Sequence, residues 1–237
     1  MFYNYLCRLA VRACVFAAAV YAYIANRAVF AAFFFGEPAA AKTTAYIIWA
    51  FMAVEMILGI VPAGINTTGS EKHRKSYFAP SDEGYDAGAL GKYAAESNIK
   101  AAYVAGVWLV IFAAVAALHI SGTTGVAETA LICILFYVCD IICVVFWCPF
   151  RSIMMKNRCC VTCRVYNWDW FMLCSPLILI KSFFSLSLVA LSLVLLVKWE
   201  VTYKKHPEYF WEGSNKNLRC ENCAERICGA KNNGITL

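Results

Sequence analysis

Two cysteine pairs carry the clearest chemical signal in the chain. Cys160 and Cys163 form a CxxC motif in a basic segment, and Cys220 and Cys223 form a second one near the C-terminus. The two-residue spacing lets a tight turn aim both sulfur atoms at one ion, and four thiolates bind Zn²⁺ tetrahedrally. We therefore expect these four cysteines to share a structural zinc ion if both motifs lie on one side of a membrane.

The cysteine pattern leaves other chemistry open. Cys159 and Cys228 flank the two motifs and are candidates for spare metal ligands or for the second thiol of a redox pair. The same thiolates could hold an iron–sulfur cluster in place of zinc, or they could remain thiols without a metal. If the motifs lie on opposite sides of the membrane, the tail cysteines could instead form a disulfide.

Charged residues inside apolar segments form a second candidate site. Glu55 and Asp140 each lie near the middle of an otherwise apolar segment, and Lys181 lies in a third one. A charge at that depth is costly unless it is paired, so such residues usually face a bundle interior or a cavity. We expect the two carboxylates to line a polar pathway for a small ion or polar ligand, with Lys181 as the counter-charge. The alternative is a structural salt bridge.

The composition of the 237 residues indicates what surrounds these sites. The chain is 62% hydrophobic and 15% charged, against roughly 45–50% and 25% in soluble domains. The mean hydropathy is +0.61. These values exclude a disordered chain, a nucleic-acid-binding domain and an ordinary soluble enzyme, and they favour a membrane protein whose main partner is the lipid bilayer.

The apolar segments predict an all-α integral membrane protein with four to six membrane-inserted helices. A crossing helix needs about 20 mostly apolar residues. The transmembrane domain is expected over 1–200, and its candidate spans are 9–35, 44–63, 99–120, 126–147 and 170–199. The remaining segments are a polar loop at 64–98, a cysteine-rich loop at 149–169 and a cysteine-rich tail at 201–237 that packs on the membrane domain.

The fifth apolar segment decides where the tail lies. It contains Pro176 and Lys181, so it is either one tilted helix or a short re-entrant element followed by a crossing helix. Only the second arrangement places the tail on the same side as the 149–169 loop. We favour it, because the tail is rich in Lys and Arg and because a shared metal site requires it.

The basic residues also predict the orientation. The 149–169 loop carries four basic residues and one acidic residue, so we place it in the cytoplasm together with the N-terminus and the polar loop. A plasma-membrane location follows as an expectation. We further expect a homo-oligomer, because a small bundle buries little surface by itself.

Three classes of function remain open at this level. The first is a small transporter or channel braced by a structural metal site of four cysteines. The second is a membrane redox protein or enzyme that uses the cysteines as cluster ligands or active thiols. The third is a scaffold without turnover. No GxSxG, P-loop or HExxH motif is present, so the sequence assigns neither a substrate nor a reaction.

Overall fold

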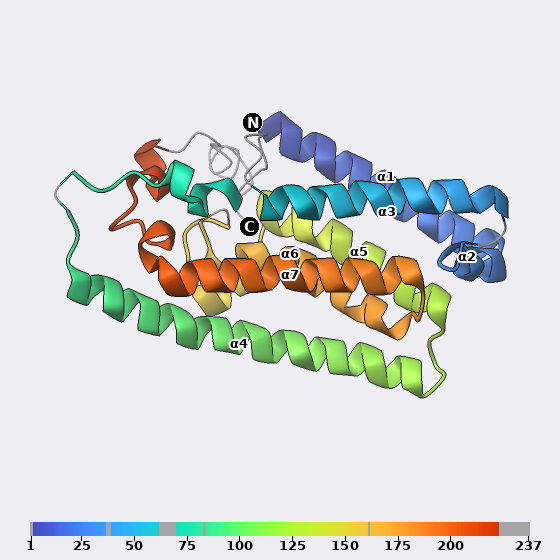
Figure 1. Ribbon diagram of the computed structural model, residues 1–237. Helices are drawn as coiled ribbons and strands as arrows, with labels where there is room; N and C mark the ends of the chain where they lie inside the picture. The colour runs from blue at the N-terminus through green and yellow to red at the C-terminus, as the bar shows by residue number, and fades with distance from the viewer. Residues whose placement is uncertain (1, 37–38, 62–69, 83, 161, 223–237) are drawn as a thin grey trace.

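Figure 1 shows a computed structural model of the chain, which describes residues 2–36, 39–61, 70–82, 84–160 and 162–222. The fold is 81% helical, and no strand occurs among the described residues. This confirms the expected all-α class. The helices run roughly along one axis and leave both described ends of the chain at the same end of the bundle (Figure 1). We call this the polar end, because the connecting segments rich in charge gather there.

In the described part of the chain, five helices are long and apolar enough to cross a membrane, judged by their length and composition. They are α1 (Phe2–Ala25), α3 (Ala39–Ile60), α4 (Ala87–Ile120), α5 (Val126–Val145) and α7 (Phe183–Lys205). Their apolar content explains why they form a bundle whose outer surface is itself apolar. Many of the large side chains on that surface are exposed, which is the pattern expected when lipid replaces water as the solvent.

Two helix boundaries differ from the sequence prediction for local reasons. The first apolar segment is not one helix, because Asn26 adopts an extended conformation and caps a separate helix, α2 (Arg27–Phe33), by accepting a hydrogen bond from the Val29 amide at 3.1 Å. Helix α4 begins at Ala87 rather than near residue 99. Asp86 caps it by accepting bonds from the next turn, so the helix extends well into the predicted polar loop.

The segment before α7 is a broken helix that recrosses the bundle. It consists of α6 (Asp169–Cys174) and the 3-10 helix η5 (Ser175–Leu179). Pro176 has no amide hydrogen, so it cannot donate to the Met172 carbonyl as an α-helix requires. The Ser175 hydroxyl donates to that carbonyl instead, at 3.1 Å. The fifth apolar segment therefore forms a hairpin of a short broken helix and a long helix, the second of the two predicted arrangements.

The broken helix lies in the core of the bundle. Cys174, Leu177 and Ile180 are all buried and pack with side chains of α3, α5 and α7. The Trp108 indole of α4 donates to the Ser175 hydroxyl at 3.2 Å, which ties the fourth long helix to the same segment. Ser175, Pro176 and Leu177 at the break are buried. Because the break itself does not face lipid, it is tolerated here.

Short helical turns close the polar end. They are η1 (Ser70–His73), η2 (Lys75–Tyr77), η3 (Phe150–Met155), η4 (Arg164–Trp168), η6 (Pro207–Phe210), η7 (Lys216–Leu218) and η8 (Cys220–Asn222). The polar loop and the tail pair directly, since the Ser81 amide donates to the Ser214 carbonyl at 3.1 Å and the Lys216 amide donates to the Ala79 carbonyl at 2.9 Å. The tail and the 149–169 loop thus lie at one end of the bundle, as the shared-site hypothesis required.

His73 holds three of these segments together. Its ring is fully buried, stacks on Phe210 with a centroid separation of 4.4 Å, and lies 3.3 Å from the Asn167 side-chain amide. Burial lowers the pKa of His73 to about 3, because the charged imidazolium would lose its hydration. The ring is therefore neutral at neutral pH.

This burial predicts an acid-sensitive fold. A histidine in the unfolded chain has a pKa near 6.5, so the contribution of a neutral His73 is complete above about pH 6.5 and is lost as the pH falls toward 3. We expect the free energy of unfolding to fall by about 1.4 kcal/mol for each pH unit below 6.5 from this residue alone. Thermal unfolding in detergent between pH 7 and pH 5 measures it.

The matched comparison is His73→Gln against His206→Gln, since His206 is exposed and paired with Glu208. The His73 variant should have a flatter pH profile than the wild type, and the His206 variant should keep the wild-type slope. Equal slopes in all three proteins would contradict the assignment.

Candidate functional site

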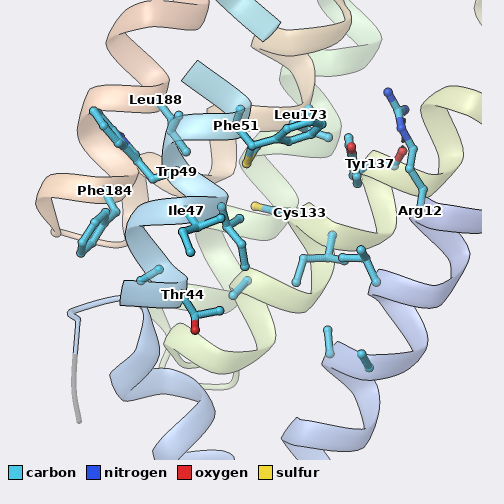
Figure 2. Close-up of a pocket in the computed structure, with 18 of the residues that line it drawn as sticks. Arg12, Thr44, Ile47, Trp49, Phe51, Cys133, Tyr137, Leu173, Phe184 and Leu188 are labelled. Carbon is cyan, nitrogen blue, oxygen red and sulfur yellow. Dashed lines mark hydrogen bonds between the residues drawn. The ribbon is translucent and has the colours of Figure 1, made fainter. Parts of the chain in front are cut away.

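An elongated groove runs between α1 and α3 (Figure 2). Helix α1 packs mainly on α5 and helix α3 mainly on α7, so these two helices barely contact each other in the described part of the chain. The space between them has a volume of about 1390 Å³. This is larger than the roughly 300–1,000 Å³ of a typical small-molecule pocket.

The walls of the groove follow from the residue sizes on the helices. Helix α1 turns small side chains such as Ala18 and Ala22 toward the groove, and helix α3 contributes larger ones such as Phe51. Cys133 of α5 and Leu173 of α6 form part of the floor (Figure 2). The lining is mostly apolar along its length, so an apolar chain would fit most of it.

A charged cluster lies at the wall of the groove near the polar end. Arg12 and Glu55 line the groove, whereas Asp140, which pairs with Arg12, does not. The Arg12 guanidinium forms an ion pair with the Asp140 carboxylate and donates to the Tyr137 carbonyl at 2.9 Å. It also stacks over the Tyr137 ring, 4.0 Å from the centroid (Figure 2). The Arg12 side chain is only 10% exposed, so the pair is largely shielded from solvent. Glu55 also lines the groove and interacts electrostatically with Tyr137 and Asp169.

The structure thus brings two of the three predicted pathway residues into one neighbourhood. Glu55 of α3 and Asp140 of α5 both interact electrostatically with Tyr137. Lys181 does not join them, because the broken helix carries the chain back to the opposite end of the bundle, where Lys181 is exposed between η5 and α7 (Figure 1). The counter-charge of Asp140 is Arg12, which the sequence prediction placed at the start of a helix.

Arg12 and Asp169 are site residues that the sequence reasoning missed. Helix α1 begins at Phe2 rather than near Leu9, which moves Arg12 from the expected helix end to the third turn. The aromatic residues Tyr3 and Tyr5 were an available signal, because aromatic side chains mark the membrane interface. Asp169 is the single acidic residue of the 149–169 loop, and the fold places it close enough to Arg12, Glu55 and Asp140 to interact electrostatically with them.

The predicted metal ligands are only partly within the described residues. Cys160 and Cys163 are buried in the 149–169 loop, Cys159 is half-buried beside them, and Cys220 is exposed in the tail. Cys223 and Cys228 lie outside the described residues. Among the side chains that the structure describes, no three His, Cys, Asp or Glu groups are arranged to hold a metal ion. The shared zinc site, or an iron–sulfur cluster in its place, stays a prediction.

Burial sets the protonation of the two loop cysteines. It raises the pKa of Cys163 to about 12. The hydrogen bond with Cys148, and after it burial, raises the pKa of Cys160. Both groups are therefore thiols in this structure. Binding of a metal would have to displace both protons, so its affinity would increase with pH.

Comparison with known proteins adds no assignment: the chain matches no family model, no curated protein and no solved structure. The groove and its charged cluster are therefore interpreted from their own geometry.

The Arg12–Asp140 pair predicts a specific pattern of stability. Removing one partner of a buried ion pair leaves the other charge uncompensated, at a cost of about 3–5 kcal/mol in soluble proteins. Because the Asp140 side chain is 25% exposed, we expect a smaller cost of about 2 kcal/mol for Asp140→Asn, which at this chain length lowers the apparent unfolding temperature in detergent by roughly 4–8 °C. The double variant Arg12→Met/Asp140→Asn should recover part of the loss, because neither charge is then unpaired.

Glu96→Gln is the control, since Glu96 forms an exposed pair with Lys100 and such pairs contribute about 0–1 kcal/mol. A double variant no more stable than the sum of its single variants would show that the two residues act independently.

Proposed function

We propose that this chain is a small membrane transporter that takes an amphipathic lipid from the bilayer into the groove between α1 and α3. The observation that carries the proposal is the groove itself, which is mostly apolar along its length and has the charged cluster at its wall toward one end. An apolar groove with a charged end fits a molecule that has one polar head and an apolar chain. The same lining argues against a channel for a bare ion, because such a path needs polar groups along its length.

Charge favours an anionic head group. The lining residues include the basic Arg8, Arg12 and Lys72 and the acidic Glu55. Asp140 and Asp169 do not line the groove, so the charged side chains that line it carry a net charge of +2. We therefore name a lipid with one phosphate charge as the substrate class. The expected location is the plasma membrane, with the polar end in the cytoplasm, because the basic loop residues gather at that end.

Filling the groove should abolish this activity. Ala18 and Ala22 are exposed on the groove side of α1, so a larger side chain there meets no core residue. We expect Ala18→Phe to slow translocation of an acyl-labelled fluorescent phosphatidylglycerol in proteoliposomes by about ten-fold or more, which corresponds to about 1.4 kcal/mol. Outer-leaflet label is bleached by an impermeant reductant, and the protected fraction is followed over time.

Ala17→Phe is the matched control, because Ala17 is also exposed on α1 but does not line the groove. It should translocate the lipid at the wild-type rate. Equal rates for the two variants would overturn the groove as the site. Equal rates for phosphatidylglycerol and zwitterionic phosphatidylcholine in the wild type would overturn the preference for an anionic head.

A further inference from the structure

Three cysteines converge where α5 ends. Cys143 lies in the last two turns of α5, Cys148 follows the helix, and Cys160 comes from the loop beyond η3. The Cys160 thiol donates to the Cys143 carbonyl at 3.3 Å. The Cys148 sulfur shares hydrogen bonds with the thiols of both other cysteines and accepts one from the Arg151 amide at 3.4 Å. Cys148 therefore has two thiol neighbours in hydrogen-bonding contact.

Exposure separates the roles of the two outer sulfurs. Cys160 is only 5% exposed, whereas Cys148 is partly exposed at the rim of the loop. A reagent from solution reaches Cys148 first, because Cys160 is buried. This is the arrangement of an attacking and a resolving cysteine.

We propose that Cys148 and Cys160 form a thiol–disulfide exchange site for a low-molecular-weight disulfide. A small substrate is favoured over a protein disulfide, because Cys148 is only partly exposed between α5 and the loop. The inference does not depend on the proposed lipid transport, since no residue of the pair lines the groove.

The exchange balances in two steps. The Cys148 thiolate attacks one sulfur of the substrate disulfide, the substrate S–S bond breaks, and the leaving sulfur departs as a thiolate that takes up the proton of Cys148. The Cys160 sulfur then attacks the Cys148 sulfur of the mixed disulfide, and the second substrate sulfur leaves with the proton of Cys160. The substrate is reduced by two electrons to two thiols, and the protein is oxidised to a Cys148–Cys160 disulfide.

The test uses oxidised glutathione with the full-length protein in detergent. After equilibration, free thiols are alkylated and the disulfides are mapped by mass spectrometry of peptides. In the wild type we expect a Cys148–Cys160 disulfide. In the double variant Cys143→Ser/Cys160→Ser no neighbouring thiol can carry out the second step, so Cys148 should carry a stable mixed disulfide with glutathione. In Cys148→Ser, the yield of any disulfide or glutathione adduct at Cys160 should drop by about ten-fold or more, because the buried thiol is not reached.

Two matched variants keep the proposal falsifiable. Cys143→Ser should still form the Cys148–Cys160 disulfide, and Cys220→Ser, which removes an exposed thiol at the same end, should behave as the wild type. A dominant Cys143–Cys148 disulfide would overturn the assignment of Cys160. Thiols that react only after a zinc chelator is added would show a metal site in place of an exchange site.

Discussion

The fold depends on one backbone interruption inside the bundle. Pro176 removes a helical hydrogen bond, and the Ser175 hydroxyl replaces it by donating to the Met172 carbonyl. An unpaired backbone group in an apolar interior costs several kcal/mol, on the order of a lost hydrogen bond or more. The interruption is therefore compatible with the core only because Ser175 and Trp108 satisfy the groups around it. The broken helix can then be short, and it returns the chain across the bundle before α7 begins.

The passage of the broken helix across the bundle determines at which end the polar loop, the cysteine-rich loop and the tail lie. Without it, α7 would carry the tail to the end opposite the 149–169 loop. With it, the polar loop, the cysteine-rich loop and the tail close one end together, and His73 can be buried among them. The Arg164 side chain adds a further tie, because it pairs with Glu200 near the end of α7 and stacks over Tyr203. The opposite end holds the simpler connections, including Glu128, which accepts hydrogen bonds from Tyr23 and Arg27.

Hydropathy alone gave the number and rough positions of the long helices, because a crossing segment needs a long apolar run that few other structures contain. Hydropathy did not predict the ends of the helices. Asn26 and Asp86 act through local caps that an apolar run does not reveal. The Arg12–Asp140 pair was hidden for a different reason: it joins residues far apart in sequence, and spacing rules carry no information about which helices become neighbours. Lys181 was an equally good partner by composition and lies at the wrong end by topology.

The cysteines show the same limit of reasoning from sequence spacing. Spacing drew attention to the CxxC motif of Cys160 and Cys163, since two residues between thiols is a recognisable ligand pattern. Spacing gave no reason to single out Cys143 or Cys148, because a free cysteine at the end of an apolar helix behaves as a small apolar residue. The fold places Cys148 against Cys160 because η3 turns the chain back onto the end of α5. Partner choice among thirteen cysteines is thus a property of that turn. A motif search ranks thiols by sequence neighbours, whereas exchange chemistry depends on which sulfur is nearest and which one solvent reaches.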